Sequence, residues 1–193
     1  MTHIALSCIV IAAIAQAPHT AHWQRGSAIA VWIDDARAPS DGPRLVERAM
    51  RAWTDAAAGR LTLTTSRAKD AAGIRVRFLP SDANYGETLP RIDRRTGLIA
   101  SADVAINADV AGDAVTRQIV VYLTALHELG HALGLPHTDE FSDIMYRFQH
   151  PDDGERYFGA YRKKLRGIGD IGSSSATGLS PADIAALHRL YDR

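Results

Sequence analysis

The sequence predicts a single α/β (α+β) domain in which a five-stranded sheet packs with three helices. The length of 193 residues is that of one domain that can bury a substantial core. Short apolar or alternating runs, which are typical of strands, dominate the first half of the chain. Apolar residues at helical spacing follow the first of these runs and return in the second half, so strands and helices are interleaved.

The first part of the chain is predicted to hold three strands and one helix. Residues 28–33 form an apolar, β-rich run and predict a buried strand. Residues 40–59 predict a helix, with a proline near its start, a glycine at its end and apolar residues at helical spacing between them: Val46, Met50, Trp53 and Ala57. Residues 61–65 and 73–78 alternate between apolar and polar side chains and predict two more strands.

A long loop, one or two short strands and a second helix are expected next. Residues 80–97 are rich in Pro, Gly, Asp and Arg and predict the loop. Residues 98–99 and 104–106 predict the remaining strand or strands. Thr116 is expected to cap a helix whose packing side is formed by Ile119, Leu123, Leu126, Gly130 and Leu133.

The last part is expected to be irregular until a closing helix. Residues 134–179 show little periodicity and many Gly, Ser and Asp residues. Ser180 and Asp183 have the spacing of a capping box, and the inner side of the helix that follows would hold Ile184, Leu187, His188 and Tyr191. Neither a repeat nor a linker divides residues 16–193, which are therefore predicted to be one domain.

Residues 1–15 are predicted to be a signal peptide. Their apolar segment is shorter than the roughly 20 residues that span a bilayer, but it suits a secretory signal. Cleavage is expected after Ala15, with a cut after Ala17 as the alternative, and the protein is then secreted or periplasmic. The one cysteine, Cys8, would be removed. A lipoprotein anchored at Cys8 and a retained, buried helix are the other interpretations.

The chain is electrically balanced, with 22 basic and 22 acidic residues and a formal net charge of zero. A neutral chain has no general attraction for nucleic acid or for an anionic membrane. We therefore expect no nucleic-acid partner, no stable membrane insertion after signal cleavage and, by default, a monomer.

The segment from His127 to His137 carries the chemistry. His127 and His131 are four residues apart, so on a helix they lie on one face, separated by about 6 Å of axial rise. Gly134 can end the helix in a left-handed conformation and turn the chain, which lets His137 return toward the other two imidazoles. Three histidines with one open position are the ligands of a catalytic zinc, so one Zn²⁺ is predicted.

Glu128 is predicted to be the general base. It follows the first ligand and projects about 100° around the helix from it, which places its carboxylate beside the ion and not on it. Because zinc lowers the pKa of a bound water to about 7, a carboxylate there can take the water's proton at neutral pH. Histidines outside the segment, including His188, are not expected to bind metal.

Residues 127–137 follow the pattern HExxHxxGxxH, and here the chain resembles the metzincin metallopeptidases, whose zinc signature this is. Met145, within residues 142–146, stands where that family has its Met-turn. The resemblance to the matrixins among them extends to residues 49–53, 61–63, 101–107 and 179–191. The nearest relatives are expected to be small bacterial matrixin-like proteins.

The resemblance implies a zinc endopeptidase with a metzincin (zincin-like) fold. That fold has a twisted mixed sheet of five strands together with three helices, and a zinc cleft separates an upper from a lower subdomain. Protein or peptide substrates would lie extended in a cleft between an edge strand near residues 104–107 and the Met-turn, adding a strand to the sheet. In that family the Met-turn methionine, here Met145, is a hydrophobic floor beneath the zinc.

Some features depart from the better-known matrixins. Arg147 stands where they commonly have proline, which leaves the shape of the pocket wall open. No pattern matches their structural zinc site, so only one zinc is predicted. Calcium is a further candidate ion: Asp93, Asp103, Asp109 and Asp113 could contribute to a Ca²⁺ site, although they lack calcium-loop spacing and solvated loop carboxylates are the alternative.

Two other functions remain open at this point. The first is a catalytically inactive, zinc-bound peptide-binding module, whose expected mark is loss of the general base; Glu128 is present. The second is hydrolysis of an amide that is not a peptide, which only a substrate test separates from peptidase activity. Tyr146, Tyr157 and Tyr161 are candidates to stabilise an oxyanion, and the sequence does not choose among them.

Overall fold

A computed structural model describes residues 21–80 and 85–192 and confirms the α/β fold class. The predicted signal peptide, residues 1–15, lies outside the described residues. The elements run in the order β1 (Ser27–Ile33), α1 (Gly42–Ala57), β2 (Leu61–Ser66), β3 (Ile74–Leu79), β4 (Gly86–Ile92), β5 (Ile99–Asn107), α2 (Ala114–Ala132), α3 (Asp153–Arg162) and α4 (Pro181–Tyr191). A short 3-10 turn, Ile168–Asp170, lies between α3 and α4.

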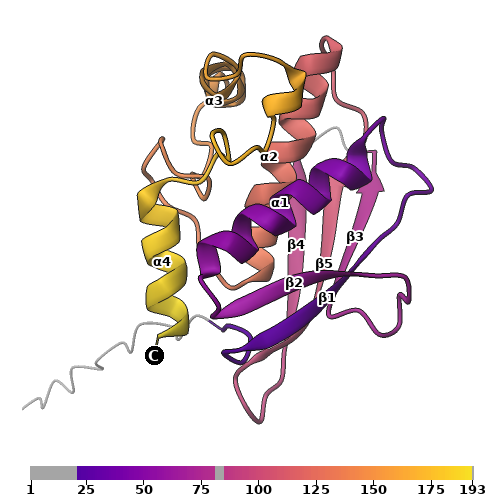
Figure 1. Ribbon diagram of the computed structural model, residues 1–193, viewed down its shortest axis with the longest axis vertical. Helices are drawn as coiled ribbons and strands as arrows, with labels where there is room; N and C mark the ends of the chain where they lie inside the picture. The colour runs from indigo at the N-terminus through magenta and orange to yellow at the C-terminus, as the bar shows by residue number, and fades with distance from the viewer. Residues whose placement is uncertain (1–20, 81–84, 193) are drawn as a thin grey trace, which may run out of the picture.

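The five strands form one mixed sheet in the order β2-β1-β3-β5-β4. Neighbouring strands are parallel except β4, which runs antiparallel to β5 at the edge of the sheet. Helices α1 and α2 pack against each other, α1 contacts β2, and α2 contacts β4 and β5 (Figure 1). The edge strand β4 is therefore placed directly beside α2, the helix that carries the histidine motif.

Alternation along the strands separates the core from an open face of the sheet. Ile74, Val76 and Phe78 of β3 are buried toward the helices, whereas Arg75 and Arg77 lie on the opposite, solvent-accessible face. Trp53 of α1 is fully buried and its Nε1 donates a hydrogen bond of 2.8 Å to the carbonyl of Leu126 on α2. This bond fixes the two helices of the core to each other.

The predicted long loop at residues 80–97 is wrong in part, because Gly86–Ile92 form β4. The sequence does not show the alternation that predicts a strand here, because β4 lies at an edge and most of its side chains are exposed. It also contains Pro90, which an edge strand tolerates. The expected short strands at 98–99 and 104–106 are parts of one strand, β5. β5 lies inside the sheet, so the predicted edge strand near residues 104–107 is also wrong, and β4 takes that place.

The predicted irregular segment 134–179 contains an additional helix, α3, so the described part of the chain has four α-helices and not three. α3 packs against α2, and Arg162 at its end pairs with Asp113 at 2.9 Å. Asp113, and not Thr116, caps α2: its carboxylate accepts a 2.8 Å hydrogen bond from the backbone N–H of Thr116. The capping box of Ser180 and Asp183 is formed as predicted.

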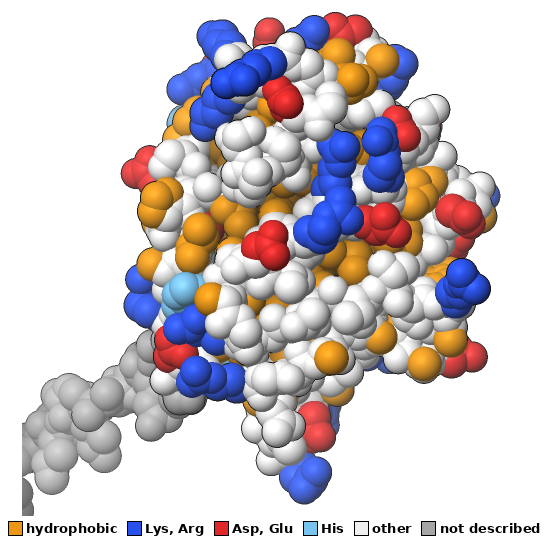
Figure 2. Space-filling model, in the orientation of Figure 1, with side chains coloured by type: hydrophobic (Ala, Val, Ile, Leu, Met, Phe, Trp, Pro, Cys, Tyr) orange, Lys and Arg blue, Asp and Glu red, His pale blue; other side chains and the backbone are white. Residues whose placement is uncertain are grey.

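Charged side chains of both signs are interspersed on the face that Figure 2 shows, as the balanced composition leads one to expect. Among the described residues, no helix is both long and apolar enough to cross a bilayer.

Candidate metal centre and active site

The turn after α2 brings three histidines together. His127 and His131 lie one turn apart on the last part of the helix, which ends at Ala132. Gly134 then has a φ of 98°, and a Cβ on it would lie 2.1 Å from the carbonyl oxygen of Ala21. Only glycine fits this left-handed, crowded position, and the turn that it allows brings His137 back toward the helix.

The three imidazoles point their Nε2 atoms at one another. The Nε2 of His137 lies 3.2 Å from that of His127 and 3.1 Å from that of His131. Tetrahedral zinc with Zn–N bonds of 2.0–2.1 Å places its ligand nitrogens about 3.3–3.4 Å apart. The spacing thus fits one ion held by all three rings, and within the described ranges these histidines are the cluster that could hold a metal.

Backbone carbonyls set the orientation of two of these rings. The Nδ1 of His127 lies 2.6 Å from the carbonyl oxygen of Ile144, and the Nδ1 of His131 lies 2.8 Å from that of Leu135. A carbonyl can only accept, so each Nδ1 carries the proton and each Nε2 presents a lone pair. Burial lowers the pKa of all three rings, that of His127 to about 4, with repulsion between the rings adding to the effect at His127 and His137. Neutral imidazoles are the form that binds metal.

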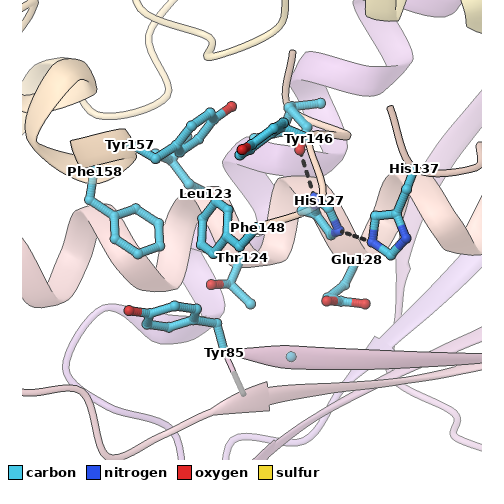
Figure 3. Close-up of a pocket in the computed structure, with 12 residues that line it drawn as sticks. Tyr85, Leu123, Thr124, His127, Glu128, His137, Tyr146, Phe148, Tyr157 and Phe158 are labelled. Atoms are coloured by element: carbon cyan, nitrogen blue, oxygen red, sulfur yellow. Dashed lines mark hydrogen bonds between the residues drawn. The ribbon is translucent and has the colours of Figure 1, made fainter. Parts of the chain in front are cut away.

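Glu128 lies beside the three rings and is not one of the cluster. Its side chain is 6% exposed and lines the same cavity as His127 and His137 (Figure 3). Burial raises the pKa of its carboxyl to about 7, against the opposing effect of a hydrogen bond from Thr88 on β4. A carboxylate that lines the same cavity as the histidine cluster is positioned to exchange protons with a water molecule or a substrate.

Met145 packs against α2 at Gly130. It is 1% exposed, and a Cβ on Gly130 would lie 2.4 Å from its Sδ and 3.1 Å from Cζ2 of Trp53. Gly130, between the two helical histidines, therefore leaves the space into which Met145 packs. The role of Met145 as a floor beneath a bound zinc stays a prediction.

Asp183 is a residue of the site that the sequence analysis used only as a helix cap. Its carboxylate also accepts hydrogen bonds from the backbone N–H groups of Ile144, at 2.9 Å, and Met145, at 3.4 Å. Ile144 is the residue whose carbonyl orients His127. The first turn of α4 thus holds the segment that orients a metal ligand, and no local pattern reports a contact across this separation in sequence.

A cavity of about 380 Å³ opens beside the histidines (Figure 3). Its wall combines residues of β4, α2, the segment after it and α3: Tyr85, Gly86, Leu123, Thr124, His127, Glu128, His137, Ile144, Tyr146, Phe148, Tyr157 and Phe158. A second cavity, of about 460 Å³, shares Tyr85 and Phe158 with the first. The centroids of the two rings are 5.0 Å apart in an edge-to-face contact, and both rings line both cavities.

The sequence analysis missed much of this wall because β4 and α3 were not predicted as elements. The rim of the cleft is formed by Tyr85 and Gly86 and not by residues 104–107. Of the three tyrosines considered for an oxyanion, each uses its hydroxyl elsewhere: Tyr146 donates to Asp153, Tyr157 to the Asp143 carbonyl and Tyr161 to the Ala176 carbonyl.

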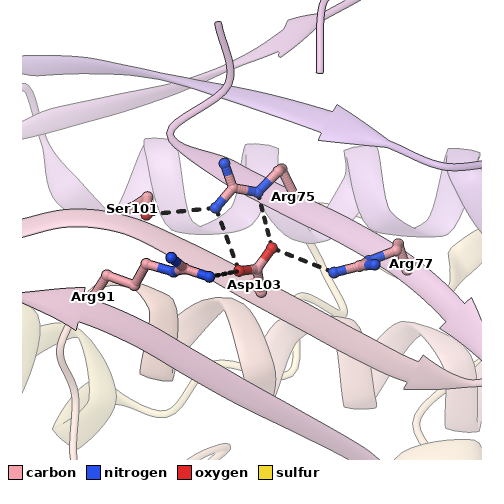
Figure 4. A network of polar contacts seen from close by, with 5 residues as sticks. All are labelled: Arg75, Arg77, Arg91, Ser101 and Asp103. Atoms are coloured by element: carbon pink, nitrogen blue, oxygen red, sulfur yellow. Dashed lines mark hydrogen bonds and ion pairs between the residues drawn. The ribbon is translucent and has the colours of Figure 1, made fainter. Parts of the chain in front are cut away.

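Two of the four aspartates considered for calcium are engaged by arginines. Asp113 caps α2 and pairs with Arg162. Asp103, on the open face of the sheet, lies 2.8 Å from Arg75, 3.5 Å from Arg77 and 3.8 Å from Arg91 (Figure 4). The Arg75 hydrogen bond holds the pKa of Asp103 below its usual range. Calcium binding stays a prediction that the structure does not test.

A comparison with protein families matches residues 34–159 to the family described as matrixin. This range begins after β1 and ends within α3, and it contains the three histidines, Glu128 and Met145. A comparison with curated proteins gives no match.

The three-histidine site predicts that the protein binds one zinc ion and that His137 is essential for it. His137→Ala removes one of three ligands. Zinc affinity should fall at least about 100-fold, because losing a residue that only hydrogen-bonds a ligand already costs up to about 100-fold. Zinc should raise the Tm of the wild type and not of the variant, since only a ligand that binds the folded state stabilises it. Equilibrium dialysis and thermal melts measure both. His150→Ala, at an exposed histidine, is the control and should bind zinc normally.

The Asp103 network predicts a pH-dependent contribution to stability. Because the folded-state pKa of Asp103 is lowered, its carboxylate stabilises the fold at neutral pH, and this effect is lost as the pH falls through the folded-state pKa. Asp103→Asn should lower the Tm by about 2–4 °C at pH 7. The difference in Tm between the wild type and Asp103→Asn should become smaller below about pH 4, where the carboxyl of the unfolded chain is protonated. Thermal melts against pH test this, with exposed Asp55→Asn as control; an equal difference at pH 7 and pH 3 would contradict it.

Proposed function

The chain belongs to the matrixin family, whose members are metallopeptidases, and from this premise we propose that it is a zinc-dependent endopeptidase that hydrolyses internal peptide bonds. The observation that carries the proposal is the convergence of three Nε2 atoms, with the buried carboxylate of Glu128 next to them and a cavity in front. When bound by His127, His131 and His137, zinc supplies a Lewis acid that polarises a carbonyl and lowers the pKa of a water molecule to about 7.

Glu128 would move the protons of the reaction. Its carboxylate takes a proton from the attacking water and then delivers it to the nitrogen of the leaving amine, so the C–N bond breaks as the amine departs neutral. A pKa raised by burial suits a group that must both accept and release a proton near neutral pH. The residual alternative, an inactive zinc-bound module that only binds peptides, is disfavoured because this carboxylate is retained.

The surroundings of the site favour an extended peptide as substrate. β4 is an edge strand, so one side of its backbone can pair with a peptide, and the strand borders the cavity through Tyr85 and Gly86. Apolar and aromatic side chains form much of the cavity wall, among them Leu123, Phe148 and Phe158. We propose that the side chain after the cleaved bond enters this cavity and that large apolar residues are preferred there.

Substituting Glu128 tests the reaction directly. Glu128→Ala should cleave a mixed peptide library at least about 100-fold more slowly than the wild type, because general acid–base catalysis contributes that much or more. Both should bind one zinc, and a chelator should abolish cleavage by the wild type. Glu155→Gln, at an exposed glutamate of α3, is the matched control and should be active. Zinc binding without cleavage by the wild type would favour the binding module, and cleavage sites before charged residues would contradict the pocket assignment.

We also propose that the protein is exported, to the periplasm or the medium, and acts as a monomer. The apolar segment within residues 1–15 and the small residues at its end support export, whereas the monomer is assumed only by default. N-terminal sequencing of the exported protein should begin at Gln16; a mature protein that begins at Met1, or one found in the cytoplasm, would contradict it.

A further inference from the structure

Two residues of the edge strand β4 face the proposed general base. Gly86 and Thr88 are two positions apart, so both lie on the side of the strand that meets α2. Strand β4 pairs with β5 through Gly86↔Ile106 and Thr88↔Val104, and this register fixes the position of β4 relative to α2. The strand is thus held in place by the sheet and not by Glu128 itself.

Thr88 contacts the Glu128 carboxylate through its hydroxyl. Its Oγ1 lies 2.7 Å from Oε2 of Glu128 and 2.9 Å from the backbone carbonyl oxygen of the same residue. The hydroxyl has a single proton, and a bond to a carboxylate oxygen is the stronger of the two choices. Among contacts between described residues, Thr88 is the side chain that bonds this carboxylate.

Gly86 lies against the other side of the same carboxylate. A Cβ at this position would lie 2.7 Å from Cγ and 2.8 Å from Oε1 of Glu128, and 2.8 Å from Cγ2 of Thr124. These separations are well below a van der Waals contact, so any larger residue would force the Glu128 side chain to move. The glycine is needed here for space.

We infer that Gly86 and Thr88 are positioning residues of the active site: together they hold the Glu128 carboxylate in one orientation beside the three histidines. The inference rests on the proposed function of Glu128. Thr88 supplies the hydrogen bond that selects one rotamer, and Gly86 supplies the gap that this rotamer occupies. The sheet edge that would pair with a substrate therefore also places the group that moves its protons.

Thr88→Val and Thr88→Ser separate this role from a merely structural one. Valine keeps the shape and strand preference of threonine but loses the hydroxyl, whereas serine keeps the hydroxyl. In Thr88→Val, kcat should fall about 10-fold, the loss expected for a hydrogen bond to a charged group, with KM changed less than about twofold. Thr88→Ser should restore most of kcat. Zinc content and Tm should match those of Thr64→Val, a control at an exposed threonine of β2.

A second readout does not depend on activity. Crystal structures of the zinc-free wild type and of Thr88→Val should show one Glu128 conformer in the former and a displaced or split carboxylate in the latter. Gly86→Ala, which leaves the Thr88 hydroxyl in place, should displace the same carboxylate and serves as the decisive variant if Thr88→Val does not fold.

The outcomes are distinguishable. Wild-type kcat in Thr88→Val, equal losses in the valine and serine variants, or an unmoved Glu128 carboxylate in both Thr88→Val and Gly86→Ala would overturn the inference. A wild type that cleaves no peptide would instead contradict the proposed function, and the crystal structures would still decide whether these two residues hold the carboxylate.

Discussion

The constraint on which the site depends is that each of the three imidazoles must present an unprotonated Nε2 to the same point. A neutral ring can do so only if its proton sits on Nδ1, and a buried Nδ1–H needs an acceptor. For His127 the acceptor is the carbonyl of Ile144, and for His131 it is the carbonyl of Leu135. Both carbonyls belong to segments that follow α2, so the backbone after the helix must be as well fixed as the helix itself.

Several contacts between the two ends of the described chain and the segment after α2 support those two carbonyls. The last carbonyls of α2 find donors in distant side chains, with Trp23 Nε1 at 2.8 Å from the oxygen of Ala132 and the Tyr191 hydroxyl at 2.9 Å from that of Leu133. Asp183 holds the backbone of Ile144 from the first turn of α4. Both ends of the described chain thus converge on the turn at Gly134, and this is the physical reason that a short histidine motif needs a whole domain.

The parts of the fold and site that the sequence predicts are those with a local signal. α1, α2 and α4 have periodic apolar residues and recognisable ends, and β1 to β3 have apolar or alternating runs, so their approximate positions were predicted correctly. The histidines and Glu128 follow from spacing alone, since four residues on a helix define a face and Gly134 defines a turn. Met145 could be placed only through the resemblance to a family.

The missed features lack such a signal. β4 is exposed on most positions and contains Pro90, so neither alternation nor propensity marks it, and without it the roles of Gly86 and Thr88 could not be seen. α3 is short, contains two glycines and packs against α2. The buried carboxylate of its first residue, Asp153, accepts hydrogen bonds from the Tyr146 hydroxyl and from two backbone N–H groups of the preceding segment. Asp183 appeared as a cap because its second role spans 39 residues of sequence.

Tyr85, which precedes β4, and Phe158 of α3 line both cavities, and their rings are in edge-to-face contact. Neither ring belongs to the histidine cluster or contacts it as a ligand, and neither is the proposed general base. The size of the cavity beside the histidines therefore depends on residues other than those that form the histidine cluster and the carboxylate. Replacing either ring by a smaller side chain would enlarge the space beside the histidines while the histidines, Glu128 and the residues that support them stay unchanged.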